Sequence, residues 1–555
     1  MLHAISRLCL SLLLAAVMLA MPYATQAQTS ADTGLREVLT SGVHPWLRAG
    51  QLGSEQPALQ ALYQSREFQP FWFNREQPTR QALELLTLLR NATSYGLRAN
   101  DYDGIALTNR LAQLPGITNA SQASARRELL DVGLSIAALR LVQHLHYGRI
   151  DPRRAGFSLN MSRAQEFDAA AALRKLASSE DVSATISEFE PRFAHYQLLK
   201  AALVRYRLLA VDAELTQLPS FTARSIKPGE SYAGAPALRR LLVAEQDMPA
   251  ADALPDADLT LDPAVVQALR AYQTRHGLQA DGALGKQTFT ALTTPFSKRV
   301  EQIELTLERW RWLPPLQSPM IVVNIPQFEL FAFQSDDDRE ENLLRMDVIV
   351  GQAYPHTQTP IFLADMKYVV FLPYWDVPYN ITRRELLPAI QRNPEYLQRN
   401  HFELVNGQGD NSPVVPATPD NIALLSSGKI RIRQRPGDDN ALGDVKFMLP
   451  NNHNVYLHST PAKQLFSQSR RAFSHGCIRV SDPLALAEYV LRFAEGKWNR
   501  EQIQAAMQDK PNQRVNLKTP IPVLIVYGTV MPLESGVVQF FDDIYGHDAR
   551  LVKLL

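Results

Sequence analysis

The spacing of apolar residues changes near Pro319, and this change limits the folds that the chain can adopt. From residue 28 to about residue 245, and again up to residue 318, apolar residues recur every three or four positions, as in amphipathic helices. After Pro319 they alternate or form short runs, as in MIVVNIPQFELFAF, which predicts strands. A chain of 555 residues is also too long for one hydrophobic core. The sequence therefore predicts a multidomain α+β protein with helical domains ahead of a β-rich domain.

Composition gives no sign of a nucleic-acid partner. Hydrophobic residues make up 46% of the chain, charged residues 20%, and the formal net charge is +1. A nucleic-acid-binding surface needs a strong excess of basic residues, and the sequence has neither a zinc-finger pattern nor a phosphate-binding loop. We therefore expect no nucleic-acid partner and no cofactor.

The N-terminal segment has the layout of a secretory signal. Arg7 precedes an apolar run over residues 8–21, and small residues lead to Ala27. The run is shorter than the roughly 20 residues that a membrane-spanning helix needs. We therefore expect residues 1–27 to be a signal peptide and the mature protein to be periplasmic. The alternative is an uncleaved signal that associates the protein with the inner membrane.

Export would leave the mature protein with one thiol. The chain has two cysteines, Cys9 and Cys477, and Cys9 lies in the apolar run of the signal. A single cysteine cannot form an internal disulfide. Cys477 is therefore an inert buried residue, a site of intermolecular pairing or a reactive thiol.

The string LDPAVVQALRAYQTRHGLQADGALGKQT has the caps and turns of a small helical module. Asp262 suits the N-cap of a helix that begins at Pro263, and Gly277 suits its left-handed end. A turn then leads to a second short helix around Thr288–Leu292. The order of these residues resembles the three-helix peptidoglycan-binding module, which we expect over residues 259–296. A generic helical hairpin is the alternative.

A helical segment interrupts the predicted strands of the β-rich domain. KYVVFLPYW, KIRIRQ, VKFML, NVYLHS and IPVLIVYGTV are apolar or alternating, as strands are. TRRELLPAIQRNPEYLQRN lies among them with a helical pattern. Long insertions of this kind are often lids, and we expect a capping insertion over about residues 376–425.

One stretch, NVYLHST followed by SHGCIRV, contains the residues of a thiol active site. In a strand that buries the Val and Leu of NVYLH, Tyr456 and His458 share the opposite face. Cys477 falls at a loop–strand junction, where Gly476 permits a tight turn. A thiol nucleophile needs a base and an oxyanion site. Strand alternation selects His458 over His453 as the base, and the N–H groups of Gly476 and Cys477 can point at an oxyanion.

Neighbouring residues predict the electrostatic environment of Cys477 and the orientation of His458. Arg470, Arg471 and Arg479 make the local potential positive, which favours a thiolate. The base also needs a group that orients its second ring nitrogen. A backbone carbonyl, Ser459 and Tyr456 all stay open for that role.

The same stretch resembles the signature of a known family. HST and SHGCIRV, with His458 nineteen residues before Cys477, resemble the L,D-transpeptidase catalytic domain of the YkuD type. PYWDVPYNITRRELLPAI and FDDIYGHD resemble its large Gram-negative YcbB-type branch. The predicted parts are a signal peptide (1–27), a helical scaffold domain (28–245), a linker (246–258), the peptidoglycan-binding module (259–296), a connecting helix (297–318), the catalytic domain (319–535) with its capping insertion (about 376–425), and a C-terminal extension (536–555).

The resemblance implies acyl transfer between peptidoglycan tetrapeptide stems. Cys477 would be the nucleophile and His458 the general base, with a thioester intermediate, release of the terminal D-alanine and a cross-link between third-position residues. Carbapenem-type inhibitors would acylate Cys477. Many relatives carry Gly or Asp where this chain has Ser459, which leaves the contact that orients the base in doubt. The supporting residues that the resemblance implies are Tyr456, Ser459, Ser474, His475, Gly476 and Arg479, with Tyr374 and Trp375 in the capping region.

Two other functions use the same sequence features. A thiol-dependent hydrolase, such as an L,D-carboxypeptidase, needs the same Cys477 and His458. A non-catalytic wall-binding scaffold would need only the module and the helical domain. Papain-like hydrolases place the cysteine before the histidine, the reverse of the order here. A metal site at His453, His458 and His475 lacks a carboxylate or second cysteine at zinc-like spacing, so we expect no metal.

Overall fold

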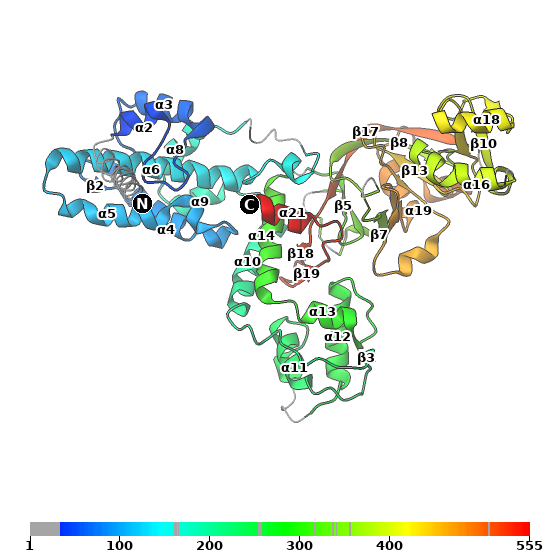
Figure 1. Ribbon diagram of the computed structural model, residues 1–555, viewed down its shortest axis with the longest axis horizontal. Coiled ribbons are helices and arrows are strands. Elements are labelled where there is room, and N and C mark those ends of the chain that lie inside the picture. The colour runs from blue at the N-terminus through cyan, green and yellow to red at the C-terminus, as the bar shows by residue number, and fades with distance from the viewer. Residues whose placement is uncertain are drawn as a thin grey trace, which may run out of the picture. The chain divides into compact units, whose positions relative to one another are not determined.

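The computed structural model describes residues 34–159, 164, 166–252, 258–315, 317–335, 338–339, 341–354, 357–393, 395–508 and 511–555 (Figure 1). The predicted signal peptide lies outside these residues. The described residues form two compact units, one made of those up to 149 and from 164 to 192, the other of 150–159 and those from 193 onward. Over the part of the chain that is described, no helix has the length and apolar character to cross a membrane.

The first unit is helical and is built around one long central helix. Its helices are α2 (Leu35–Ser41), α3 (Gln56–Gln64), α4 (Arg80–Arg90), α5 (Gly104–Gln113), α6 (Ala120–Tyr147), α8 (Ala169–Ala177) and α9 (Val182–Ser187). Asp131, near the middle of α6, is fully buried and accepts hydrogen bonds from the Tyr63 hydroxyl and the Trp72 amide, both at 2.7 Å. Burial raises the pKa of its carboxyl to about 6. Because its hydrogen bonds are satisfied, Asp131 has a structural role.

The second unit begins with helices that the sequence had placed in the scaffold. These helices are α10 (Ala194–Leu209) and α11 (Ala235–Ala244), followed by α12 (Pro263–Arg275), α13 (Lys286–Leu292) and α14 (Phe296–Arg311). Within this part of the predicted scaffold domain, α10 buries Tyr196, Leu203 and Tyr206 in the core of the second unit. The module also begins earlier than residue 259, since α11 precedes α12 and packs against it. As predicted, Asp262 caps α12 and Gly277 is left-handed, with φ of +64°.

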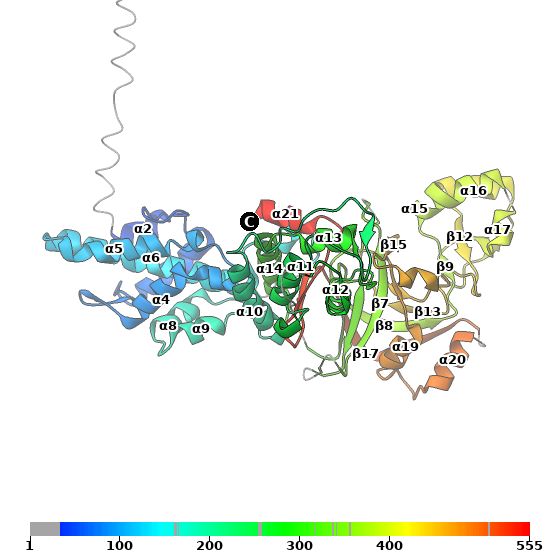
Figure 2. The same cartoon turned by 90° about the horizontal axis from the view of Figure 1, so that it is seen from below.

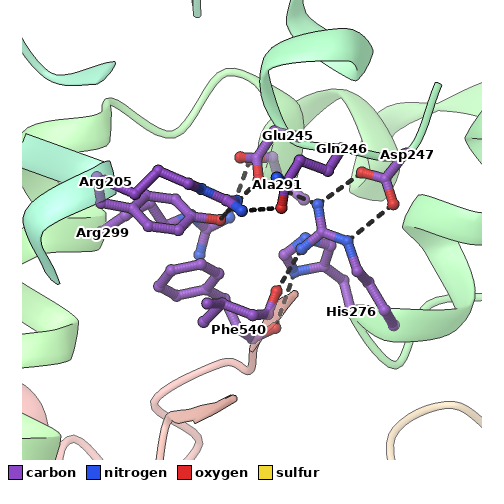
Figure 3. Close-up of polar contacts among 11 residues, drawn as sticks. Arg205, Glu245, Gln246, Asp247, His276, Ala291, Arg299 and Phe540 are labelled. Carbon is purple, nitrogen blue, oxygen red and sulfur yellow. Dashed lines mark hydrogen bonds and ion pairs between the residues drawn. The ribbon is translucent and has the colours of Figure 1, made fainter. Parts of the chain in front are cut away.

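A buried ionic cluster ties this module to the end of the chain (Figure 3). The Arg275 guanidinium pairs with Glu245 at 3.0 Å and with Asp247 at 2.6 Å. The next residue, His276, places Nδ1 3.1 Å from the carbonyl oxygen of Phe540 on strand β19 (Val538–Phe540). The predicted linker, residues 246–258, is thus anchored at its start through Asp247. We call the following residues the module network: Glu245, Asp247, Arg275, His276 and Arg299.

The β-rich part of this unit is a sheet that closes on itself. The strand order in the described residues is β15-β7-β16-β14-β13-β8-β17-β5-β6, and β6 also pairs with β7. The strands are β5 (Met320–Asn324), β6 (Glu329–Phe333), β7 (Leu344–Gly351), β8 (Leu363–Phe371), β13 (Val445–Met448), β14 (Leu457–His458), β15 (Ala472–Ser474), β16 (Ile478–Val480) and β17 (Gln513–Val526). Helix α19 (Pro483–Leu491), α20 (Arg500–Gln508), the hairpin of β18 (Val530–Pro532) with β19, and α21 (His547–Leu554) follow.

The capping insertion has its own sheet and core, and it is longer than predicted. Strands β9 (Trp375–Asp376), β10 (Phe402–Val405), β11 (Val414–Val415) and β12 (Arg431–Gln434) pair with one another. The predicted strand KIRIRQ therefore belongs to the insertion, which extends to Gln434. Figure 2 shows β9 and β12 in one lobe with α15 (Tyr379–Ile381), α16 (Leu387–Arg392) and α17 (Tyr396–Arg399). The segment η7 (Thr382–Leu386) joins α15 to α16.

Candidate active site

Two neighbouring parallel strands bring the predicted nucleophile and base together. Strand β14 pairs with β16 so that His458 lies opposite Arg479, and the amide of Ile478 donates to the carbonyl of Tyr456 at 3.1 Å. Cys477 directly precedes β16 and is half-buried. The thiol is therefore at the start of one strand and the imidazole is on the next.

Backbone carbonyls orient the imidazole of His458. The ring is buried, and its Nδ1 lies 2.5 Å from the carbonyl oxygen of Ser459. The Leu442 carbonyl also hydrogen-bonds the ring. A carbonyl can only accept, so Nδ1 carries the proton. This contact uses the backbone of residue 459, so the Ser side chain in place of Gly or Asp does not disturb it.

The environment of His458 keeps the imidazole neutral. Burial, followed by the positive charges of Arg479 and Lys446, lowers its pKa to about 3. With the proton on Nδ1, Nε2 keeps its lone pair at neutral pH. The ring is therefore neutral at pH 7, which is the form a general base needs.

Tyr456 connects the thiol to the capping insertion. Its ring centroid lies 5.8 Å from that of His458, so the two side chains share one face as predicted. The sulfur of Cys477 lies 3.8 Å from the carbonyl oxygen of Asn454, and the neighbouring Tyr456 lowers the pKa of the thiol. The Tyr456 hydroxyl also hydrogen-bonds the side chain of Trp375, and burial raises its pKa well above the usual value. Trp375 thus lies at the site, whereas Tyr374 stacks under the guanidinium of Arg433 at 4.1 Å.

The cations near the thiol are Lys446 and Arg479. Burial is the largest influence on the thiol and raises the pKa of Cys477, while Tyr456, Lys446 and Arg479 lower it. The Lys446 ammonium lies 4.0 Å from the centroid of the Tyr456 ring and faces His458 across the β13–β14 pair. Burial lowers the pKa of Lys446, and Cys477, Asp376 and Asp410 raise it, whereas Arg479 Nε has no hydrogen-bond partner among the described residues.

Two of the three arginines predicted to act on the thiol are engaged elsewhere or exposed. Arg471 pairs with Asp347 at 2.7 Å and donates to the carbonyl of Phe328. Arg470 is exposed. Only Arg479 has the predicted effect, because sequence proximity to a cysteine does not determine where a long side chain points.

The nucleophile loop, residues 474–477, is held by hydrogen bonds from within and from outside. The Ser474 hydroxyl donates to the Cys477 carbonyl at 2.5 Å and accepts from the Gly476 amide at 3.1 Å. The Gly476 carbonyl accepts from the Thr359 hydroxyl at 2.8 Å. Gly476 has a φ of +118°, which favours glycine. The Gly476 amide thus donates to Ser474, whereas the Cys477 amide donates to no acceptor among the described residues.

His475, next to the nucleophile, pairs with the capping insertion. Its Nε2 lies 2.8 Å from a carboxylate oxygen of Glu385 on η7, and both side chains are exposed. The residue joins the nucleophile loop to the insertion. In the described ranges, no three His, Cys, Asp or Glu side chains come together as a metal ion would need.

Sequence reasoning missed four residues that support this site: Lys446, Thr359, Tyr545 and Glu385. Lys446 could have been found, because VKFML alternates and places its lysine on the polar face of a strand. The others are far from Cys477 in sequence: Glu385 and Tyr545 lie in the quoted strings PYWDVPYNITRRELLPAI and FDDIYGHD, but those strings do not show what they contact.

Comparison with known proteins gives three family matches along the chain. Residues 57–203 match a family described as a scaffold domain, residues 245–292 one described as "Putative peptidoglycan binding domain", and residues 318–523 the YkuD family, described as the L,D-transpeptidase catalytic domain. These matches confirm the expected order of helical scaffold, peptidoglycan-binding domain and β-rich catalytic domain. The YcbB-type branch stays a prediction.

A relative from Haemophilus influenzae carries a corresponding name. This protein, named "Putative L,D-transpeptidase", is 29% identical over 279 residues, which cover 49% of this chain and 54% of the relative. The match therefore spans about half the length of either protein.

Proposed function

We propose, from the premise that residues 318–523 are an L,D-transpeptidase catalytic domain beside a peptidoglycan-binding domain, that this protein cross-links peptidoglycan through a thioester on Cys477. The observation that carries the proposal is the pairing of a buried, neutral His458 with a thiol on the neighbouring strand. Such a pair suits general-base activation of a thiol.

The first step transfers the stem peptide to the enzyme. The sulfur of Cys477 attacks the carbonyl of the third residue of a tetrapeptide stem while His458 Nε2 takes the thiol proton. The Cys477 amide donates to the oxyanion that forms on the carbonyl. The C–N bond to the terminal D-alanine then breaks, and its amine leaves with the proton from His458.

The second step passes the acyl group to another stem. An amine of the acceptor attacks the thioester, His458 takes its proton, and the C–S bond breaks to return the thiol. Lys446 and Arg479 stabilise negative charge on the sulfur when it leaves. Trp375 borders the thiol from the insertion, so the insertion can restrict the access of water to the thioester.

The other domains and the predicted signal fit this reaction. A peptidoglycan-binding domain in the same chain raises the local concentration of the polymer. Periplasmic residence after signal removal would place the enzyme beside its substrate. Carbapenem-type inhibitors are expected to acylate Cys477, because their strained carbonyl offers the same electrophile as the donor stem.

Purified tetrapeptide muropeptides test the proposal. The wild-type protein should yield cross-linked dimers and free D-alanine, and Cys477→Ser should yield neither. Dimers from Cys477→Ser would exclude the thioester mechanism. Trimmed monomers without dimers from the wild-type protein would replace the transferase with the hydrolase. Mass spectrometry after carbapenem treatment should show one adduct, on Cys477.

A further inference from the structure

The peptide bond between Gly476 and Cys477 carries the amide that faces the reacting carbonyl. A trans peptide is planar, so its C=O and N–H point in opposite directions. The Gly476 oxygen is fixed by the Thr359 hydroxyl at 2.8 Å, in a buried position. The contacts that fix the position of Thr359 therefore also determine the direction of the Cys477 N–H.

Thr359 is held in turn by a tyrosine from the end of the chain. The Thr359 amide donates to the Tyr545 hydroxyl at 3.2 Å, and that hydroxyl donates to the Gly351 carbonyl at 2.6 Å. The Gly351 amide donates to the Thr359 hydroxyl at 2.9 Å. The hydroxyls of Thr359 and Tyr545 each donate one hydrogen bond and accept another. This group of hydrogen bonds therefore has a single arrangement.

The geometry at Gly351 leaves little room for another arrangement. A Cβ at this position would lie 2.0 Å from the Thr357 carbonyl oxygen. The backbone is thus closely packed between β7 and the nucleophile loop, where the Gln352 amide also donates to the Ser474 carbonyl at 2.9 Å. If Thr359 moved, the carbonyl of Gly476 to which its hydroxyl donates would move with it.

We propose that Tyr545 is a positioning residue for acyl transfer: through Thr359 it holds the Gly476–Cys477 peptide so that the Cys477 amide meets the oxyanion. Tyr545 lies outside residues 318–523, which match the catalytic domain, and within the predicted C-terminal extension. The extension is on this basis part of the active site. The inference rests on the proposed function for the identity of the acyl donor, but its chemistry needs only a carbonyl that Cys477 attacks.

Two electrophiles separate this role from a general effect on the thiol. A p-nitrophenyl ester is attacked at a carbonyl: a C–S bond forms, an oxyanion develops, and nitrophenolate leaves. Iodoacetamide is attacked at a saturated carbon, where iodide leaves and no oxyanion develops. Loss of the hydroxyl in Tyr545→Phe should slow acylation roughly tenfold to hundredfold, less than the roughly 10²–10³-fold seen when an oxyanion-hole donor itself is removed, and leave alkylation within about twofold.

The experiment measures both rate constants on the full chain, with labelling at Cys477 confirmed by peptide mass spectrometry. Thr359→Val should repeat the effect of Tyr545→Phe, and Thr359→Ser, which keeps the hydroxyl, should restore acylation. Tyr489→Phe is the matched control, because that buried tyrosine donates to the Phe333 carbonyl, away from the nucleophile loop. Equal losses in both reactions, or no loss of acylation, would overturn the inference.

The muropeptide assay distinguishes failure of the proposed function from failure of the inference about Tyr545. If the wild-type protein makes no dimers but acylation still depends on Tyr545, the proposed function fails and the inference stands. If dimers form and acylation is independent of Tyr545, the reverse holds.

Discussion

Two buried polar clusters of the second unit differ in how completely their cations are paired. In the module network, Arg275 lies within 3.0 Å of both Glu245 and Asp247 (Figure 3). Around Cys477, Arg479 Nε has no hydrogen-bond partner among the described residues, and burial lowers the pKa of Lys446 despite Asp376 and Asp410. A satisfied network stabilises one arrangement. Cations that are buried without full pairing gain an additional partner when the neighbouring sulfur becomes anionic.

The two clusters also contain two similar histidines. His276 and His458 are both buried, both contact a backbone carbonyl through Nδ1, and both have a pKa lowered first by burial. His276 lies among Arg275 and Arg299, whereas His458 is on β14, the strand that pairs with the one Cys477 precedes. A depressed histidine pKa therefore does not identify a catalytic base. Whether such a histidine can act as a base depends on the chemical group next to it.

Breaking the module network should produce the largest effect on stability. In Arg275→Met, the carboxylates of Glu245 and Asp247 stay buried without their cation, which costs about 3–5 kcal/mol. We expect the thermal midpoint of the second unit to fall sharply, measured by calorimetry. The control Arg207→Met removes an ion pair to Glu304 that is about one-third exposed, and should cost about 1 kcal/mol or less. Equal losses in the two variants would mean that the network is not the stabilising element.

The pH dependence of stability tests the same network through His276. Burial holds the folded-state pKa of His276 well below 6.5, so below pH 6.5 the unfolded chain binds a proton that the folded chain does not. Stability is thus complete above this pH and falls below it. Between pH 7 and pH 5 this histidine should cost about 2 kcal/mol.

His276→Asn checks the assignment, because its amide keeps a donor near the position of Nδ1. Denaturant unfolding at pH 7 and pH 5 should show a smaller loss in the variant than in the wild-type protein. His458 and His547, with pKa values lowered to about 3 and about 4, act in the same direction and are unchanged. An identical loss in variant and wild-type protein would refute the role of His276.

The sequence predicted most where local rules act. Strand alternation paired Tyr456 with His458, and the structure places their ring centroids 5.8 Å apart on one face. Asp262 and Gly277 marked the ends of α12, because capping depends on a few adjacent residues. These signals need no knowledge of the rest of the fold.

Long-range packing explains what the sequence did not predict. The helical period of α10 gives its buried face but not the core that the face joins, which is that of the second unit. KIRIRQ was read as a catalytic-domain strand, although β12 pairs with β9 and β10 of the insertion. Tyr545 reaches Gly351 across 194 residues of chain, a contact that only the tertiary structure shows.

Removing an active-site cation should affect chemistry and spare stability, unlike Arg275→Met. Lys446 lowers the pKa of Cys477, so in Lys446→Met that pKa rises further and the pH profile of iodoacetamide alkylation moves to higher pH. Alkylation at pH 7 should slow several-fold, by about tenfold for each unit that the profile moves. Lys446→Arg should restore the profile.

The thermal midpoint of Lys446→Met should stay the same or rise, because burial disfavours the Lys446 ammonium more than Asp376, Asp410 and Cys477 favour it. Lys463→Met, a change at an exposed lysine of the same domain, controls for loss of charge alone. A large drop in the midpoint, with an unmoved alkylation profile, would place Lys446 with the structural cations and remove the contrast between the two clusters.

The smallest effect is expected at the contact between His475 and Glu385. This pair lies between the nucleophile loop and the insertion at 2.8 Å, but water reaches both side chains. Exposed pairs contribute about 0–1 kcal/mol and are screened by salt. Glu385→Gln should therefore leave the thermal midpoint unchanged and alter the transfer rate by about twofold at low salt, with no difference at high salt.

The matched control is Glu395→Gln, which removes an exposed pair with Arg399 within the insertion and should not alter the rate. If Glu385→Gln instead lowers the rate as much at high salt as at low salt, the carboxylate acts as a specific hydrogen-bond acceptor for His475, and the insertion would then take part in the chemistry of the nucleophile loop.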